Sequence, residues 1–579
     1  MEKKALEYMN DEMNTHNSIS HLSTLCWSVT TIFLSFFLLI HLLVMFCFSI
    51  GSSVLSGIAP FALFISLAIG DWFFRRNGGH GLQRIAAPAI VLVILAIALF
   101  LAKSFFDMSW DGLWYHQTAV YQMSHGWNPI YDPLHSFSSH LQDWLRFYAK
   151  GPWYIALALF ETTHNIEMAK AAPWLALVAT FSVVFAVSID FGMSRSKAAI
   201  IAALVSLNPV VICQLASYLV DGLLISFLAC FIAAMLSWFR QRNVQALMIA
   251  MIAAILCINT KLTGLVYICF FIAAGGLYVL IRRRDLLWRY AAIQVTFIVI
   301  GTAVFGYNPY VTNTIHRGHP FYPMLGTAAY PSLSQRGYDM IEIFETPHNM
   351  TGRNRFVRFA YAIFGHPGPQ AFYNGENATL MWPFNIRWED VSVFRFHEVR
   401  ISGFGPLFSG ALLFGLLLLV IAIVKIGKPS ELYILFTATI ILSLLVSIHT
   451  WWARYGPQFW WLPIVAIIAI FTIPGKDAAH RAAFGLAVIL VINVTLVTIG
   501  HFMWEIEATR TTYEQMALLR QSGDVEVDFQ YFHEPYGERL HNAGVTFHAV
   551  RQLQCTNPIE LISVVPGYPG AVRVCIQKK

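Results

Sequence analysis

The sequence predicts an all-α polytopic membrane protein, and three of its features carry that prediction. Its residues are 57% hydrophobic and only 12% charged, with a mean hydropathy of +0.58, which suits lipid better than a water-solvated surface. Apolar runs recur between residues 25 and 502, and their lengths approach the roughly 20 residues that a membrane-spanning helix needs. Lys and Arg gather in alternate connections between these runs, as expected for the cytoplasmic ends of such helices.

The apolar runs predict a bundle of about thirteen transmembrane helices. The first run is too long for the apolar part of a signal peptide, and no small-residue cleavage pattern follows it, so we expect it to remain as the first anchor. The predicted spans are 25–48, 54–74, 88–106, 172–191, 198–213, 218–239, 246–258, 262–281, 290–305, 406–424, 432–448, 459–473 and 484–502.

The basic clusters predict the orientation of the chain. They precede the first span and follow every second span after it, so all of them fall on one side of the membrane. Because such residues stay in the cytoplasm, we expect a multi-pass protein of the cell inner membrane with a cytoplasmic N-terminus. The apolar run 152–160 is too short to cross, and a crossing there would break the alternation, so we expect a half-helix at the outer interface.

These spans divide the chain into three parts. Residues 1–24 form a cytoplasmic segment, 25–502 a transmembrane domain with outer loops 107–171 and 307–403, and 503–579 an extracytoplasmic C-terminal domain. The last part begins as a helix through Arg520 and then becomes strand-like in VEVDFQYF and ELISVVPG, which predicts a small α+β cap. Cys555 and Cys575 lie in this cap, and whether they pair is left open.

The net charge of +6 does not indicate nucleic-acid binding, because the basic residues sit in short clusters and not along one face. The predicted outer ends of the spans carry residues of a different kind. They are isolated, mixed in charge and close to the hydrocarbon region, where an ionisable side chain is costly and indicates function. This set comprises Asp107, Asp111, Asp221, Lys261, Asn308, Asn313, His316, His449, Arg454 and Tyr455.

One outer stretch has the pattern D-x-x-x-YH-x-x-x-VY-x-x-x-x-GWNP over residues 111–129. It resembles the first outer loop of the GT-C superfamily of membrane glycosyltransferases. Further blocks resemble those of bacterial GT-C-like proteins in the same order: ASYLVDG (216–222), NTKLTGL (259–265), GYNPYVTN followed by HPFYP (306–323) and WWARYGPQ (451–458).

The resemblance implies a GT-C-like helix bundle and a sugar transfer from a polyprenyl-phosphate carrier to a glycan, lipid or protein acceptor on the outer face of the membrane. No cofactor is expected. The acidic dyad D-x-D or E-x-D of some family members is absent, since Asp107 and Asp111 are four residues apart, so a bound divalent metal is not supported.

The expected catalytic residues are Asp111, Asp107 and His116. Asp111 is the candidate general base for the acceptor hydroxyl, although an Asp here also suits a helix cap. Asp107 either takes part directly or marks the end of the third span. His116 either shares a helix face with Asp111, binds a metal, or is a structural histidine with its hydrogen bonds satisfied.

The expected substrate-binding residues fall into two groups. Lys261 and Arg454 suit the carrier phosphate, although Lys261 also suits snorkelling and Arg454 anchoring at an aromatic belt. Aromatic rings suit stacking on a sugar or anchoring at the interface, and Asn308 and Asn313 suit substrate contact or loop shaping. The full set is Asp221, Lys261, Asn308, Asn313, Arg454, Tyr455, Trp114 and Tyr115.

Two other functions compete with this interpretation. A lipid-linked glycan polymerase or ligase would also act on the outer face, with a diphosphate donor that calls for more Arg and Lys there. A transporter or flippase would place charges at the membrane midplane on broken helices and often show two related halves. The sequence shows neither of those two transporter features.

Overall fold

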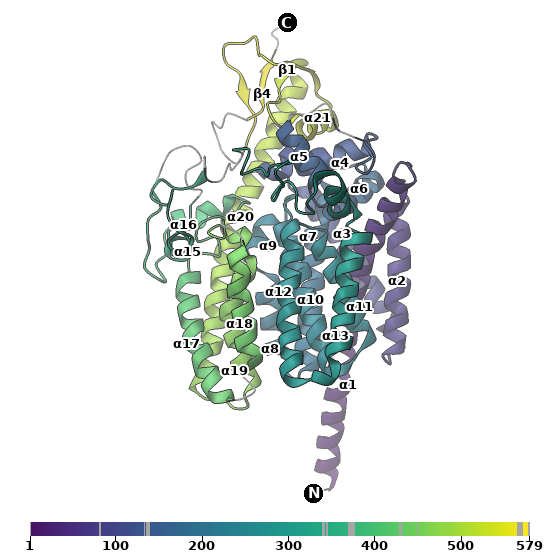
Figure 1. The fold of residues 1–579 in the computed structure, drawn as a ribbon, viewed down its shortest axis with the longest axis vertical. Helices are drawn as coiled ribbons and strands as arrows, with labels where there is room; N and C mark the ends of the chain where they lie inside the picture. The colour runs from purple at the N-terminus through teal and green to yellow at the C-terminus, as the bar shows by residue number, and fades with distance from the viewer. Residues whose placement is uncertain are drawn as a thin grey trace.

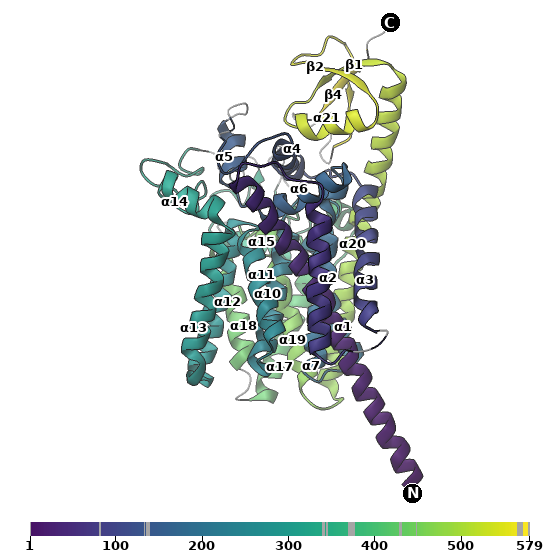
Figure 2. The ribbon, with the colours of Figure 1, turned by 90° about the vertical axis from the view of Figure 1, so that its right-hand side faces the viewer.

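The computed structural model describes residues 2–79, 81, 83–132, 134, 139–337, 342, 345–368, 377–427, 431–446, 449–563 and 571–576. Long helices lie side by side in a bundle, short helices cover one end of it, and a small domain with a sheet stands on that end (Figure 1). We call this end the cap side. The N-terminus lies at the opposite end of the molecule (Figure 2).

Within the described residues, nine helical segments are long and apolar enough to cross a membrane, and three shorter apolar helices accompany them. This confirms the predicted all-α polytopic fold, while the number of about thirteen spans stays a prediction. The long segments are α1 (Glu2–Ser49), α2 (Ile58–Arg76), α3 (Gln83–Ser104), α7 (Ala172–Asp190), α10 (Asp221–Gln241), α12 (Leu262–Arg282), α13 (Leu287–Val299) continued by η4 (Ile300–Val304), α17 (Phe408–Ile426) and α20 (Ala478–Gln521). The shorter ones are α11 (Val244–Ile258), α18 (Glu431–Ser443) and α19 (Trp461–Thr472).

The run 198–213, predicted as one span, is instead two helices, α8 (Arg195–Ser206) and α9 (Pro209–Gln214). The break lies at Asn208, whose side chain accepts a hydrogen bond from the backbone N–H of Val210 and so caps α9. Pro209 then occupies the first position of the new helix, where its missing N–H costs nothing.

The first outer loop forms several short helices on the cap side, and α4, α5 and α6 are visible there in Figure 1. They are η1 (Gly112–His116), α4 (Gln117–Ser124), α5 (Ser139–Phe147), α6 (Gly151–Thr163) and η2 (Met168–Ala171). Helix α6 is the predicted half-helix, and every residue from Gly151 to Phe160 is buried within the protein, so this stretch presents no face to lipid. Its first turn touches the chain beyond α11: the Gly151 N–H donates to Asn259 O over 2.9 Å, and a Cβ at Gly151 would lie 2.6 Å from that oxygen.

The second outer loop and the connection after α18 add further short helices on the same side. These are η5 (Tyr307–Val311), α14 (Thr312–Arg317), α15 (Arg355–Phe364), α16 (Trp388–Ser392), η7 (Val393–Arg395) and η10 (Ala453–Tyr455). Figure 1 shows α15 and α16 above α17, on the cap side of the bundle.

The C-terminal domain is a small α+β unit, as predicted. Its sheet has the order β2-β1-β4-β3 and consists of β1 (Asp524–Asp528), β2 (Thr546–Ala549), β3 (Ile559–Glu560) and β4 (Arg573–Ile576). Helix α21 (His533–Asn542) joins the parallel pair β1 and β2, and β4 runs antiparallel to both of its neighbours. Cys555 and Cys575, whose pairing the sequence left open, form a disulfide. The last four residues of the predicted strand ELISVVPG lie outside the described residues.

Helix α20 and the first outer loop fix this domain to the bundle. Because α20 has 44 residues, it is about 66 Å long at about 1.5 Å per residue, and it continues from the bundle into the domain (Figure 2). Leu113 of η1 packs into the domain's hydrophobic core with Leu519, Val525 and Leu540. The first outer loop is therefore held between the bundle and the C-terminal domain.

Candidate active site on the cap side

Asp111 faces Arg454. The Arg454 Nη2 donates to Asp111 Oδ2 over 2.9 Å, and the side chains are 6% and 21% exposed for Arg454 and Asp111. Asp111 directly precedes η1, yet among the described residues its carboxylate accepts no capping hydrogen bond from that helix. The capping role is therefore not seen, and Asp111 keeps a solvent-accessible carboxylate beside a buried cation.

Arg454 has unused hydrogen-bonding capacity. Its Nη2 also donates to Tyr455 Oη over 3.2 Å, but Nε and Nη1 are buried and meet no acceptor in the described part of the chain. The guanidinium carbon lies 5.2 Å from the ring centroid of Trp452 and 5.1 Å from that of Tyr455. Buried donors nearly always have partners, and the guanidinium fork fits a carboxylate or phosphate, so Arg454 is arranged to receive an anion.

Asp221 and Lys261 form a second ion pair next to this one. The Lys261 Nζ lies 2.6 Å from Asp221 Oδ1 and 4.7 Å from the ring centroid of Tyr455, so the Tyr455 ring contacts both cations. Gln214 Nε2 donates to Asp221 Oδ2 over 3.3 Å. Asp221 begins α10 and Lys261 directly precedes α12, so two helix ends deliver this pair. Lys261 is paired inside the protein and does not snorkel away from it.

Aromatic side chains of the first outer loop adjoin these charges. Tyr115 stacks on Trp144 with ring centroids 5.4 Å apart, and Tyr148 lies 5.7 Å from Tyr115. Burial, with Asp111 as the next largest cause, raises the pKa of Tyr115, so its hydroxyl stays protonated. Trp114 instead packs against the core of the C-terminal domain and against the core of the bundle, which gives it a packing role.

His116 is buried and neutral. Its Nδ1 accepts a hydrogen bond of 2.7 Å from Trp153 Nε1, so the ring proton is on Nε2, which meets no partner among the described residues. Burial lowers the pKa of His116 to about 3. With its lone pair occupied, His116 suits the donation of a hydrogen bond.

Asp107 is enclosed by hydrogen bonds. Its carboxylate accepts from the N–H and Oγ of Ser109, from Gln117 Nε2 and from the N–H of Tyr218, and the residue is fully buried. Gly112 packs against it so closely that a Cβ there would lie 2.2 Å from Asp107 Oδ2. Asp107 therefore joins the first outer loop to the start of α10, and this arrangement does not favour its expected catalytic role.

Asn308 and Asn313 contact backbone carbonyls. Asn308 Nδ2 donates to Pro129 O over 2.5 Å, and Asn313 Nδ2 donates to Tyr322 O over 2.8 Å. The Asn308 bond connects the two outer loops, and the Asn313 bond joins two parts of the second one, so both side chains shape the loops. Neither side chain has a described contact with Asp111 or Arg454.

The second outer loop adds three charged residues that the sequence analysis did not single out. Arg400 Nη2 lies 3.1 Å from Glu345 Oε2, and the Arg400 guanidinium carbon lies 4.4 Å from the Trp452 ring centroid. The N–H of Trp110 donates to Glu398 Oε1 over 3.3 Å. Burial raises the pKa of Glu345 to about 7, although Arg400 and Arg454 oppose this shift.

Backbone hydrogen bonds position the second loop beside Arg454. The N–H groups of Ala453 and Arg454 donate to Arg400 O and Val399 O, each over 3.3 Å. The signal for these residues in the sequence was weak, because they lie in an aromatic loop without periodicity. Only the short run HEVR, with three polar or charged residues around one valine, set Glu398 and Arg400 apart.

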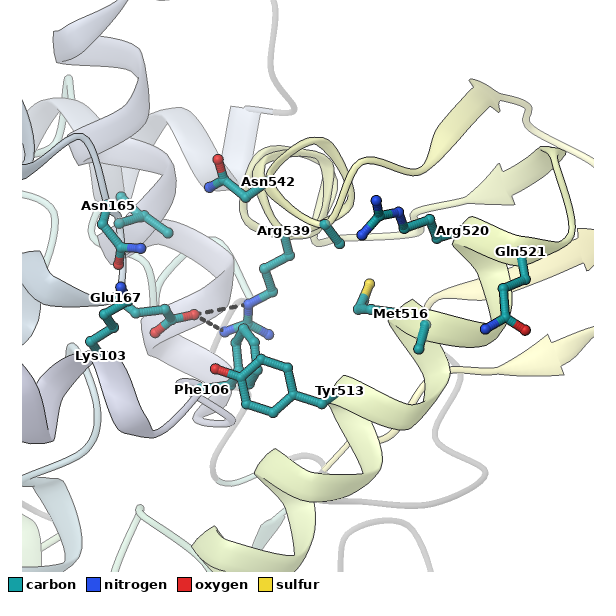
Figure 3. Close-up of a pocket in the computed structure, with 13 residues that line it drawn as sticks. Lys103, Phe106, Asn165, Glu167, Tyr513, Met516, Arg520, Gln521, Arg539 and Asn542 are labelled. Carbon is teal, nitrogen blue, oxygen red and sulfur yellow. Dashed lines mark hydrogen bonds and ion pairs between the residues drawn. The ribbon is translucent and has the colours of Figure 1, made fainter.

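A pocket of about 630 Å³ lies on a different part of the cap side, between α20, α21 and the ends of the first outer loop. Figure 3 shows Arg539 reaching from α21 to Glu167, with the rings of Phe106 and Tyr513 beside the pair. Arg539 Nη2 lies 2.8 Å from Glu167 Oε1 and 2.7 Å from Asp107 O. This contact connects the C-terminal domain to the first outer loop.

No protein family and no curated protein matches this sequence. Among solved structures, the chain is similar to the crystal structure of ArnT from Cupriavidus metallidurans bound to undecaprenyl phosphate, with a TM-score of 0.44, 13% sequence identity, and coverage of 80% of this chain and 86% of that one. The apo state of the same ArnT gives a TM-score of 0.43 and 12% identity, covering 81% of this chain and 86% of that chain.

Proposed function

We propose that this protein is a membrane glycosyltransferase that moves a sugar from a polyprenyl-phosphate carrier to a glycan, lipid or protein acceptor on the outer face of the cell inner membrane. The observation that carries the proposal is the buried guanidinium of Arg454, which bonds Asp111 through Nη2 while Nε and Nη1 have no described partner. The N-terminus is then cytoplasmic, and the cap side faces outward.

The proposal is also supported because the sequence blocks that resemble GT-C proteins lie together in the fold. Asp111, Asp221, Lys261 and Arg454 come from four separate blocks and meet in two ion pairs that share the Tyr455 ring. A purely structural ion pair would need only the bond between Arg454 and Asp111. Arg454 has two further buried donors, Nε and Nη1, without a described partner, and these donors suit a ligand.

The expected reaction uses these groups as follows. The acceptor oxygen attacks the anomeric carbon of the sugar, and the bond from that carbon to the carrier phosphate breaks. Asp111 takes the proton of the acceptor hydroxyl, and the polyprenyl phosphate leaves with its new negative charge against the Nε and Nη1 of Arg454. The planar guanidinium of Arg454 thereby holds both the base and the leaving group in fixed positions.

Lys261 and the aromatic rings have supporting roles in this mechanism. Lys261 adds positive charge beside Tyr455, where it stabilises the departing phosphate. Tyr115 and Trp452 are buried beside the charged cluster, and Trp452 packs against the guanidinium of Arg454. The charges gather at the cap end of the bundle and not at its midplane, so no observation favours a transporter.

Sugar transfer in isolated membranes tests the proposal. Membranes containing the native protein, Asp111→Asn or Asp132→Asn receive a radiolabelled pool of polyprenyl-phosphate sugars, and the label in acceptor material is counted. Asp132 is an exposed acid of the same loop, so it is the matched control. We expect transfer by the native protein and Asp132→Asn, and a loss of about 10²- to 10⁴-fold in folded Asp111→Asn.

Two results would count against this account. Absence of transfer by folded native protein with the whole pool of sugars would reject the proposed reaction. Equal transfer by Asp111→Asn and the native protein would reject Asp111 as the base.

A further inference from the structure

A second polar cluster lies behind the candidate active site, inside the protein. It consists of His397, which follows η7, and of His501 and Glu505, which lie four residues apart on α20. All three residues are fully buried. Residues at i and i+4 share one face of a helix, so His501 and Glu505 both point toward the loop that holds His397.

Five polar atoms of this cluster have no hydrogen bond to the described part of the chain. His397 Nε2 lies 2.9 Å from Glu505 Oε1 as an ion pair, but both ring nitrogens of His397, both carboxylate oxygens of Glu505 and Nε2 of His501 are buried without a hydrogen bond in the described chain. A buried carboxylate and two imidazoles left in this state are costly. Such a set indicates a missing partner that bonds all three side chains.

The orientation of His501 identifies the kind of partner. Its Nδ1 lies 2.9 Å from Phe394 O, so Nδ1 carries the proton and donates it, and Nε2 has a bare lone pair. A histidine that binds a metal characteristically donates its other ring N–H to a backbone carbonyl in this way.

The distances in the cluster fit a small cation. The ligand atoms all lie within 4.8 Å of one another, while ligands of a tetrahedral Zn²⁺ at about 2.1 Å lie roughly 3.4 Å apart. Small side-chain rotations therefore close the set around an ion. Two imidazoles and one carboxylate are ligands that Zn²⁺ accepts and that Mg²⁺ and Ca²⁺ do not prefer.

We propose that His397, His501 and Glu505 form a buried site for a divalent cation of the Zn²⁺ type, which joins the second outer loop to α20. His397 directly precedes Glu398 and lies three residues before Arg400, so the ion would hold the segment that delivers both residues to the cap side. The site is separate from the acidic dyad whose absence argued against a catalytic metal, and it does not depend on the proposed function.

Metal content of the purified full-length protein tests this site. The native protein, His501→Gln, Glu505→Gln and Glu507→Gln are loaded with Zn²⁺ in detergent, freed of unbound metal, and measured by mass spectrometry of the elements. Glu507 is exposed and two residues further along the same helix, so it is the matched control. We expect about one Zn²⁺ per chain in the native protein and in Glu507→Gln, and a loss of at least about tenfold in the other two.

A second measurement on the native protein keeps the test decisive if a variant does not fold. Thermal unfolding is followed with Zn²⁺ present and after removal of metal by a chelator, and we expect a higher midpoint with Zn²⁺ because only the folded chain assembles the site. Native protein that retains no Zn²⁺ and unfolds at the same temperature in both conditions would overturn the proposal. Equal Zn²⁺ content in folded Glu505→Gln and Glu507→Gln would overturn it as well.

Discussion

Arg454 donates from Nη2 to Asp111 Oδ2 over 2.9 Å, although the two residues are 343 positions apart in the chain. The same guanidinium keeps two buried donors without a described partner. One arginine thus positions a carboxylate and keeps donors whose fork suits an anion such as a phosphate.

The Lys261–Asp221 pair predicts a large effect on stability. Lys261→Met leaves the carboxylate of Asp221 buried and unpaired, and breaking a buried pair from one side costs about 3–5 kcal/mol. We expect a clear drop in the midpoint of thermal unfolding of the purified protein. Lys425→Met, at an exposed pair with Asp477, is the control and is expected to change the midpoint little.

A double variant separates charge burial from packing at this pair. Lys261→Met combined with Asp221→Leu removes both charges, so it is expected to unfold at a higher temperature than Lys261→Met alone. A double variant that is less stable than the single one would mean that the charges themselves are not the cause.

Glu345 predicts a dependence of stability on pH. Burial raises the pKa of Glu345 from 4.5 to about 7, so the folded state holds a proton that the unfolded state has lost between these two values. The free energy of unfolding contributed by this group is therefore largest below about pH 4.5 and falls as the pH rises through about 7. Glu345→Gln cannot lose a proton and is expected to lack this fall.

Thermal unfolding at a series of pH values measures this effect in the native protein and in Glu345→Gln. Arg400, Arg454, Asp111 and Glu398 also act on Glu345, so the comparison uses the difference between the two proteins at each pH. A constant difference across the range from about pH 4.5 to 7 would show that Glu345 titrates as an ordinary carboxyl group.

Arg539 predicts how firmly the C-terminal domain is attached. Arg539→Met removes the bonds to Glu167 and to the backbone oxygen of Asp107, and it leaves Glu167 with Lys170 as its remaining described cation. We expect faster hydrogen exchange in α21 and in η1, because the domain and the first outer loop share this contact.

The matched control for this change is Arg510→Met, since Arg510 pairs with Glu514 on the exposed face of α20. Its exchange rates in α21 are expected to equal those of the native protein. Unchanged exchange in Arg539→Met would mean that the packing of Leu113 alone holds the domain.

The sequence predicts the long helices well because their apolar runs approach the length that lipid demands. The predicted span 198–213 was wrong at Asn208 and Pro209, although this pair is a recognisable cap followed by a helix start. The prediction there used only the length of the apolar run, whereas the cap at Asn208 and the helix start at Pro209 divide the run into two helices.

The candidate site is predictable where a charge interrupts an apolar run, as at Asp221, Lys261 and Arg454. The same reasoning does not distinguish Asp107 from Asp111, because their difference lies in partners such as Gln117 and Tyr218, which only the folded chain brings close. Glu345 and Arg400 were missed because a loop without periodicity does not indicate which of its side chains point into the protein.

Binding of a polyprenyl phosphate to the purified protein tests the central claim most directly. The affinities of native protein, Arg454→Gln and the exposed control Arg510→Gln are compared, with the uncharged polyprenol as a second ligand. Hydrogen bonds to a charged group contribute about 1.5–3 kcal/mol, so we expect folded Arg454→Gln to bind the phosphate roughly 10- to 150-fold more weakly. Binding of polyprenol is expected to be equal in all three proteins, and equal binding of the phosphate by Arg454→Gln and the native protein would contradict the account.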